Sequence, residues 1–142
     1  MLNKIAPLGF RNMRNGFTLA YHWIALVIAA GVVVQFFLAG VGVFGADSFD
    51  AHKSVGWMLH SASILILIAA IIGPRDRKSI LMSIAFIVVF TIQVMLPGAQ
   101  DDSPWLAAFH PVLALAVLGM AVHIGMPAIS RRRAASAPNP AR

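Results

Sequence analysis

Residues 23–44 form an unbroken apolar run, WIALVIAAGVVVQFFLAGVGVF, in which Gln35 is the only strongly polar side chain. Three further apolar stretches follow it, at residues 55–73, 80–96 and 105–126. A helix needs about 20 apolar residues to cross the hydrocarbon of a bilayer, and all four stretches are near that length. None of them alternates as a transmembrane β-strand does. We therefore predict an all-α membrane protein with four transmembrane helices.

The composition agrees with this prediction. Hydrophobic residues make up 59% of the chain and charged residues only 11%, whereas a soluble domain carries about 25% charged residues. The chain has no cysteine, which excludes disulfides, thiolate metal sites, iron–sulfur clusters, a cysteine nucleophile and covalently attached c-type haem. The five histidines are therefore the main candidates for binding a metal or a cofactor.

Short polar segments separate the apolar stretches. Connections of this length force neighbouring helices to run antiparallel, which predicts an up-down-up-down four-helix bundle. The expected spans are approximately residues 17–45, 51–73, 79–97 and 104–129. Together they form a transmembrane domain of residues 17–130, preceded by a cytoplasmic tail of residues 1–16 and followed by a disordered basic tail of residues 131–142.

The basic residues predict how the chain is oriented in the membrane. Ten of the eleven lysines and arginines lie in the N-terminal tail, between the second and third spans, or in the C-terminal tail. They are Lys4, Arg11, Arg14, Arg75, Arg77, Lys78, Arg131, Arg132, Arg133 and Arg142. Basic segments stay in the cytoplasm, so we expect a bacterial inner-membrane protein with both termini cytoplasmic and no nucleic-acid partner. Cleavage of the first span as a signal peptide is a competing interpretation.

Four of the histidines form two pairs at matching heights along the bundle. The rise of about 1.5 Å per helical residue places His52 about 31 Å and His110 about 28 Å above the cytoplasmic ends of their helices. The same estimate places His22 and His123 at about 8 and about 9 Å. Two histidines from different helices suit bis-imidazole ligation of a haem. His60 lies near mid-depth without a partner, and a hydrogen bond within the bundle is its simplest role.

Small residues near these histidines leave room for a porphyrin, among them Gly56, four residues after His52. Small residues also let helices pack closely without a ligand, and histidines near helix ends can lie in the headgroup region. Gln35 and Gln93 lie in the outer half of the bundle. Each can hydrogen-bond a haem propionate, a histidine Nδ1–H or a quinone carbonyl, or only a neighbouring helix. The pattern is therefore open to both a haem and a packing interpretation.

Several motifs resemble those of bacterial b561-type cytochromes, a family of four-helix membrane proteins that bind two haems. They are His22-Trp23 before the first long apolar run, His52-Lys53-Ser54-Val55-Gly56 at the start of the second span, and His110 and His123 toward the two ends of the fourth. The resemblance implies that His22 and His123 bind an inner haem b. It also implies that His52 and His110 bind an outer haem b.

The chain also resembles a small, uncharacterised bacterial family of four-span membrane proteins. Its motifs are Gln-Phe-Phe-Leu-Ala-Gly at residues 35–40, His-x-x-x-Gly at residues 52–56, and His110-Pro111. This resemblance favours an outer site formed by His52 and His110, with Gln35 and Gln93 nearby. His110 and His123 are 13 residues apart, and 13 steps of about 100° do not return to the same helix face. One outer haem is therefore an alternative to two haems.

These observations predict a membrane b-type cytochrome that transfers electrons through haem b. Quinol, superoxide or a redox partner subunit would exchange electrons with it, which includes a haem-dependent oxidoreductase, and quinone is a further candidate ligand. A non-redox accessory or assembly subunit of a larger membrane complex is the main alternative. A small transporter or lipid-binding bundle is the third class, although the four apolar stretches contain no Asp, Glu, Lys or Arg, and ion-coupled transport usually needs one. Each class is compatible with an oligomer.

Overall fold

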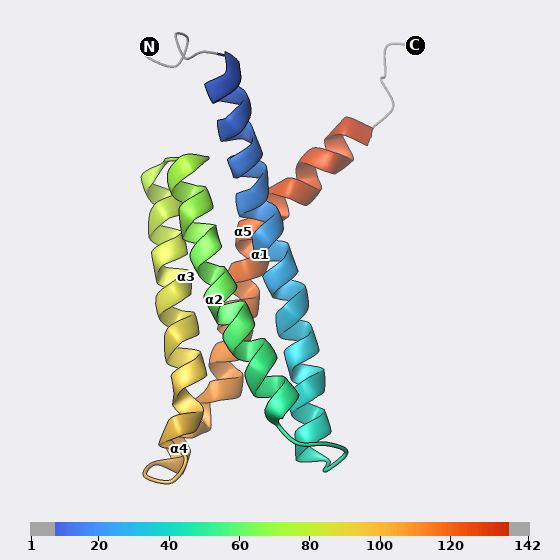
Figure 1. Cartoon of the computed structure of the whole chain (residues 1–142), viewed down its shortest axis with the longest axis vertical. Coiled ribbons are helices and arrows are strands. Elements are labelled where there is room, and N and C mark those ends of the chain that lie inside the picture. Colours follow the sequence, from blue (N-terminus) through green and yellow to red (C-terminus); the bar gives the residue numbers. More distant parts are fainter. Residues whose placement is uncertain (1–7, 137–142) are drawn as a thin grey trace.

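The computed structural model describes residues 8–136 and confirms the all-α bundle with four helices long and apolar enough to span a membrane (Figure 1). The long helices are α1 (Leu8–Val43), α2 (Asp50–Ile72), α3 (Arg77–Met95) and α5 (Phe109–Ser136). Two short helices between α3 and α5 are η2 (Leu96–Ala99) and α4 (Pro104–Ala107). The fourth expected span thus begins as a separate turn, α4, before the continuous helix α5.

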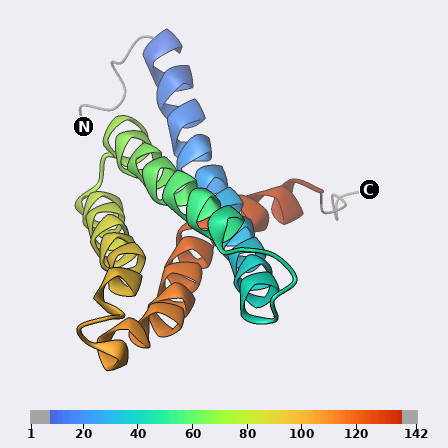
Figure 2. The same cartoon turned by 60° about the horizontal axis from the view of Figure 1, so that its bottom comes forward.

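The helices alternate in direction and form a ring of four. Helix α1 packs against α2 and α5, and α3 packs against the same two helices. Therefore α1 lies diagonally opposite α3, and α2 lies diagonally opposite α5 (Figure 2). The terminal end of the bundle carries the start of α1, the α2–α3 connection and the end of α5. The loop end carries the α1–α2 connection, η2 and α4.

The first and last helices extend further than the sequence predicted. Helix α1 begins at Leu8, within the expected N-terminal tail. Helix α5 continues to Ser136, so residues 131–136 are helical and the expectation of a disordered tail is wrong for them. Arginine and alanine fill most of this segment, and both favour helix. The remaining parts of the two expected tails, residues 1–7 and 137–142, lie outside the described residues.

Helix α5 bends near the terminal end. Pro127 lies inside this helix, and an internal proline removes one helical hydrogen bond and bends the chain at the preceding turn. Figure 1 shows the last, red part of α5 turning away from the bundle. The guanidinium carbon of Arg132 in this part lies 5.2 Å from the ring centroid of Trp23. This cation–π contact joins the bent segment to α1.

Helix α3 begins with a side-chain cap at the terminal end. The Asp76 carboxylate accepts hydrogen bonds from the Ser79 backbone N–H, at 2.9 Å, and from the Ser79 hydroxyl, at 2.8 Å. These bonds to the charged form lower the pKa of Asp76. The cap therefore stabilises the helix above the pKa of the unfolded carboxyl, and this contribution is lost as the pH falls through the lower pKa of the folded state.

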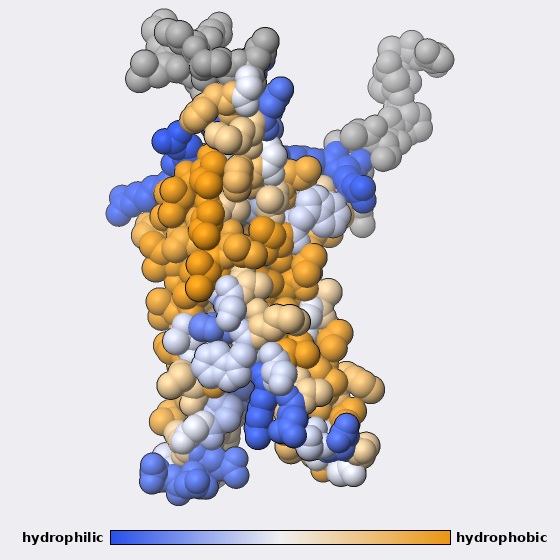
Figure 3. Space-filling view, in the orientation of Figure 1, coloured by the Kyte–Doolittle hydropathy of each residue, from blue (hydrophilic) through white to orange (hydrophobic). Residues whose placement is uncertain are grey.

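Apolar side chains cover the outside of the bundle. Large exposed hydrophobic residues occur on all four long helices, for example Val27, Ile64, Val88 and Leu115. Figure 3 shows an apolar surface on the terminal half of the molecule and a more hydrophilic surface toward the loop end. An exposed apolar surface of this extent is unfavourable in water, whereas lipid covers it in a bilayer. The helices are therefore in contact with lipid.

Two glycines allow α2 and α5 to approach α1 closely toward the terminal end. A Cβ atom on Gly73 would lie 2.5 Å from the Thr18 backbone nitrogen and 2.7 Å from the Phe17 carbonyl carbon. A Cβ atom on Gly125 would lie 2.5 Å from carbons of the Leu26 side chain. Small residues at such crossings let helix backbones pack closely in membranes. The separation of the helices at this end therefore depends on these two positions.

We predict that Gly73→Ala lowers the free energy of unfolding by about 1–3 kcal/mol, because the added methyl group meets backbone atoms that cannot rotate away. Gly119→Ala in α5 is the matched control, since nothing lies within 4 Å of a Cβ atom there. The control should leave stability unchanged or raise it, because alanine favours helix over glycine. The measurement is denaturant unfolding in mild detergent, followed by circular dichroism. Equal stability of the two variants would contradict the prediction.

Candidate functional site

A cavity of about 360 Å³ lies between the four helices toward the loop end. Its polar lining residues are Gln35, His52, Lys53, Gln93 and His110. Its remaining lining residues are Val32, Phe36, Ala39, Gly56, Trp57, Phe90, Val94, Pro97, Gly98, Pro111, Ala114 and Val117. This volume is typical of sites for small molecules, and an apolar wall with a few polar groups is their usual composition. All the residues predicted for the outer site, including Gly56, therefore meet in one cavity.

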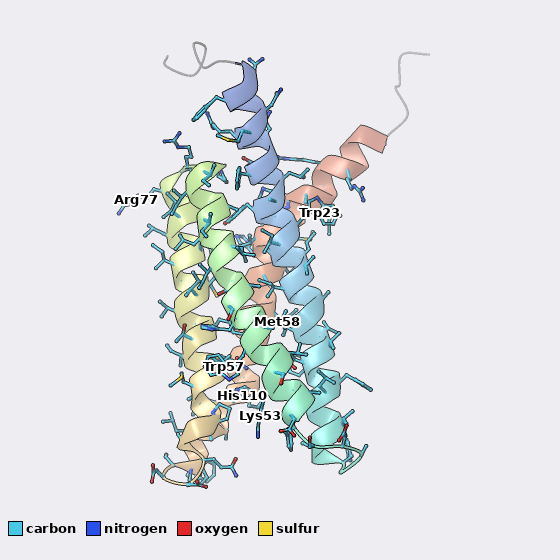
Figure 4. All side chains as sticks on the ribbon, in the orientation of Figure 1. Trp23, Lys53, Trp57, Met58, Arg77 and His110 are labelled. Carbon is cyan, nitrogen blue, oxygen red and sulfur yellow. The ribbon has the colours of Figure 1, made fainter. Side chains whose placement is uncertain are left out.

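Two imidazole rings that line this cavity make an edge contact with each other. His52 comes from α2 and His110 from α5, and the ring centroids are 6.0 Å apart with an interplanar angle of 74°. The two helices are diagonal, and no Cα atom of α2 lies within 8 Å of a Cα atom of α5. The histidine side chains therefore bridge the gap between them. Figure 4 shows His110, Lys53 and Trp57 together toward the loop end, far from Arg77. The pairing of His52 with His110 that equal heights predicted is thus present as a ring contact.

His52 is held by a reciprocal pair of hydrogen bonds with Gln35 of α1. The His52 Nδ1 lies 3.2 Å from the Gln35 backbone carbonyl oxygen. A carbonyl only accepts, so Nδ1 carries the hydrogen and the lone pair is on Nε2. The Gln35 amide Nε2 donates in return to the His52 backbone carbonyl at 2.8 Å. The Gln35 Oε1 is buried and has no hydrogen-bond partner among the described residues.

His110 is held by Gln93 of α3 in a related way. The His110 Nδ1 donates to the Gln93 backbone carbonyl at 2.7 Å. The Gln93 amide nitrogen lies 3.1 Å from His110 Nδ1 and 3.3 Å from His110 Nε2. An atom nearly equidistant from the two ring nitrogens lies over the ring and off the lone pair of Nε2, so the Gln93 amide packs against the His110 ring. Both histidines therefore have the same tautomer, with the Nε2 lone pair available for a ligand or a donor.

A constant offset in the sequence relates the two glutamine–histidine pairs. Eight pairs of residues are identical at this offset of 58, and those near the cavity are Gln35 and Gln93, Leu38 and Leu96, Gly40 and Gly98, and His52 and His110. The sequence-based interpretation missed this repeat. Its signal was visible as Gln-x-x-Leu-x-Gly, with a histidine twelve residues after the glycine, occurring twice. In many membrane transporters, internal structural repeats place the binding site at the interface between the repeats.

The buried core follows the same offset. In the first hairpin, α1 buries Ala25, Ile28 and Val32, and α2 buries Leu59, Ser63, Ile66 and Ala70. The residues 58 positions later are Ser83, Phe86 and Phe90 of α3, and Val117, Ala121, Ile124 and Ala128 of α5, all of which are buried. The two hairpins, α1–α2 and α3–α5, therefore bury residues at equivalent positions of the repeat. His52 and His110 also occupy equivalent positions of the repeat.

The second predicted pair, His22 and His123, does not come together. His22 is buried, and its Nδ1 donates to the Ile124 backbone carbonyl at 2.6 Å. His123 is exposed on the outside of α5, and it makes no ring contact with His22 within the described part of the chain. The two residues were expected at the same height along the bundle, but His123 lies on the side of α5 that faces away from the other helices. His22 instead links α1 to α5 shortly before Pro127.

His60 joins two helices through a hydrogen bond. The Thr91 hydroxyl of α3 donates to the Ile87 carbonyl at 2.8 Å, so its oxygen is free to accept. The His60 Nε2 lies 2.9 Å from this oxygen and donates to it. The His60 ring also makes edge contacts with the rings of Trp57 and Phe90, with centroids 5.7 and 5.6 Å away. The simplest role expected for His60, a hydrogen bond within the bundle, is therefore the one the geometry gives it.

Part of this site lies in a segment that is similar to a family without an assigned function. Residues 35–99 are similar to a family of unknown function, DUF6220. No curated protein and no solved structure matches the chain. The matched segment includes Gln35, His52 and Gln93 but ends before His110. It agrees with the predicted resemblance to an uncharacterised family, and no comparison links the chain to b561-type cytochromes.

We predict that Thr91→Val lowers the free energy of unfolding by about 0.5–1.5 kcal/mol, because the His60 N–H loses its acceptor inside the membrane. Thr91→Ser keeps the hydroxyl and is the matched control, so it should restore most of the stability. The measurement is denaturant unfolding of the two variants in detergent micelles. Identical stability of Thr91→Val and the unmodified protein would show that the bond contributes nothing.

Proposed function

We propose that this protein is a membrane b-type cytochrome in which His52 and His110 hold one haem b as axial ligands. The observation that carries the proposal is the pair of imidazoles from two helices in edge contact, 6.0 Å apart between ring centroids. Metal–imidazole nitrogen distances are about 2.0–2.1 Å, so two imidazoles on opposite sides of one metal place their centroids roughly 6 Å apart. The separation of the two rings, 6.0 Å, has the size that ligation of one metal by both would require, and it is also the size of an ordinary edge contact between rings.

The number of protein donors favours haem over a bare metal ion. Residues 8–136 contain no cluster of three or more histidine, cysteine, aspartate or glutamate side chains that could hold a metal. Zinc sites take three or four ligands from the protein, whereas haem brings four nitrogens of its own and needs only axial ligands. Two imidazoles in a mainly apolar cavity therefore suit a metal inside a macrocycle.

The side chains around the histidines have separate roles in this proposal. The Gln35 and Gln93 backbone carbonyls fix the imidazole tautomers and raise the basicity of Nε2. Among the described residues that line the cavity, Lys53 is the one lysine or arginine, and its ammonium group can pair with a carboxylate at the mouth. Val32, Phe90 and Val117 are buried walls that exclude water. Bound haem b would supply a one-electron carrier, and the protein would supply its burial and orientation.

The distribution of charge supports an orientation in a bacterial inner membrane. Arg75, Arg77 and Lys78 lie at the terminal end together with the start of α1 and the end of α5. By the positive-inside rule this end is cytoplasmic, and the cavity then lies near the outer face. Electrons would reach or leave the haem there through quinol, superoxide or a redox partner subunit. An accessory subunit without haem is the alternative function.

We predict that the purified protein shows haem b bands in a dithionite-reduced minus oxidised visible spectrum, with one haem per chain. His52→Ala and His110→Ala should each abolish the bands, because a single imidazole leaves one axial position open and the haem weakly held. His60→Ala and His123→Ala are the matched controls, since these side chains lie outside the pair, and both should retain the spectrum.

The possible outcomes separate the alternatives. Loss of half the haem in His22→Ala or His123→Ala would indicate a second, inner haem and contradict the single-haem proposal. A colourless protein that co-purifies with a membrane complex would instead favour the accessory subunit. A colourless protein with no partner would leave the facing histidines as a packing contact, and the cytochrome proposal would be wrong.

We predict that single cysteines report the proposed orientation directly, because the chain has none of its own. Ser48→Cys in the α1–α2 connection should react with a membrane-impermeant maleimide added to intact spheroplasts. Asn12→Cys in the first turns of α1 should react only after the membrane is opened. Both residues are exposed and both substitutions preserve the charge, so the pair is matched. The reverse pattern would place the termini outside.

A further inference from the structure

The start of α3 carries two basic side chains on the outside of the bundle. Arg77 and Lys78 are exposed, and Figure 4 shows Arg77 pointing away from the other helices. Neither side chain forms a hydrogen bond or an ion pair with another residue in the described part of the chain. The neighbouring carboxylate, Asp76, is engaged by the backbone N–H and the hydroxyl of Ser79. Two positive charges therefore lie at the terminal end without an anion among residues 8–136.

A shallow groove runs along α3 from these two side chains toward the middle of the bilayer. Its lining residues are Arg77, Lys78, Leu81, Met82 and Ala85. Ala85 is eight residues after Arg77, which is about 12 Å along the helix. Leu81 and Ala85 are exposed, and α2 and α5 are the long helices against which α3 packs. In a bilayer the groove therefore faces lipid.

The order of charged and apolar residues in this groove matches that of a phospholipid. A phosphate at the headgroup level would meet Arg77 and Lys78, and an acyl chain that extends toward the midplane would lie over Leu81, Met82 and Ala85. Basic side chains at this level of a membrane attract anionic lipids. A free anion has no chain to cover the apolar floor, and an irregular protein segment is costly in hydrocarbon because its backbone groups stay unpaired. The groove therefore favours a lipid over either alternative.

The corresponding face of α1 has no such charges. The residues 58 positions before the groove residues are all apolar, and they are Leu19, Ala20, Trp23, Ile24 and Val27. The two basic side chains thus belong to the second hairpin alone. Packing that the two halves of the repeat share does not require them.

We propose that the groove on α3 binds one anionic phospholipid, with its phosphate between Arg77 and Lys78. The lipid belongs to the leaflet at the terminal end, which is the cytoplasmic leaflet in the proposed orientation. Each basic residue near the membrane surface enriches an anionic lipid about 5-fold, and two enrich it up to about 30-fold over a zwitterionic lipid. The site is separate from the histidine cavity and does not depend on haem.

A single tryptophan beside the groove measures which lipid lies there. Trp23→Phe, Trp57→Phe and Trp105→Phe remove the native indoles, and Ile84→Trp places a reporter about 10 Å along α3 from Arg77. Ile84 is exposed and is not part of the groove lining, so the reporter leaves the groove open. The full chain is reconstituted in vesicles of phosphatidylcholine and phosphatidylglycerol. Bromine, which quenches tryptophan fluorescence, is carried by the acyl chains of phosphatidylglycerol in one set and of an equal amount of phosphatidylcholine in the other.

We expect brominated phosphatidylglycerol to quench the reporter more strongly, by an amount that corresponds to about 5- to 30-fold enrichment. Arg77→Gln combined with Lys78→Gln should make the two lipids quench equally. Arg11→Gln combined with Arg131→Gln is the matched control, because it removes the same charge from exposed residues of the same end outside the groove. This control should keep the preference.

Three results would overturn the proposal. Equal quenching by the two lipids in the reporter protein would show that the groove binds no anionic lipid. An equal loss of preference in both double variants would show a general attraction of the basic end and no local site. A preference that disappears when inorganic phosphate replaces chloride at constant ionic strength would show that the groove takes a free anion. None of these results depends on whether the protein binds haem.

Discussion

The site depends on one kind of interaction, the hydrogen bond from a histidine Nδ1 to a backbone carbonyl of the preceding helix. A polar ring in hydrocarbon is costly unless its N–H is satisfied, and the carbonyls of Gln35 and Gln93 satisfy His52 and His110. Each bond ties the start of one helix to the end of the helix before it. It also leaves Nε2 as the nitrogen without a hydrogen. The same contact therefore stabilises each hairpin and prepares its imidazole for a ligand.

The four spans and the pairing of His52 with His110 could be predicted from the sequence because both depend on distance along a helix. Apolar length gives the spans, and a constant rise per residue gives the height of each histidine. The heights of His22 and His123 could not show whether their rings meet, because height along a helix does not specify the side of the helix on which a residue lies. The 13 residues between His110 and His123 put the two on different faces of α5, and His123 is exposed.

The packing around the cavity was not predictable from residue spacing. The reciprocal bond between Gln35 and His52 requires a glycine at position 56, and only the structure shows how close the amide lies to it. The sequence marked Gly56 as room for a porphyrin, whereas the space that its missing Cβ leaves is used by Gln35. The internal repeat could be found in the sequence from a few identical residues at one offset. At most of the equivalent core positions, however, both residues are buried but differ in type, as Ile28 and Phe86 do.

The position of the cavity follows from where the helices approach each other. Gly73 and Gly125 bring α2 and α5 against α1 at the terminal half, where any larger residue would collide with backbone or with Leu26. The diagonal helices α2 and α5 have no Cα atoms within 8 Å of each other, and toward the loop end the side chains of His52 and His110 reach across the gap between them. Close packing at one end and polar bridging at the other thus leave a space at the level of the imidazoles. A tighter crossing at the loop end would bring the rings together and remove the space that a ligand needs.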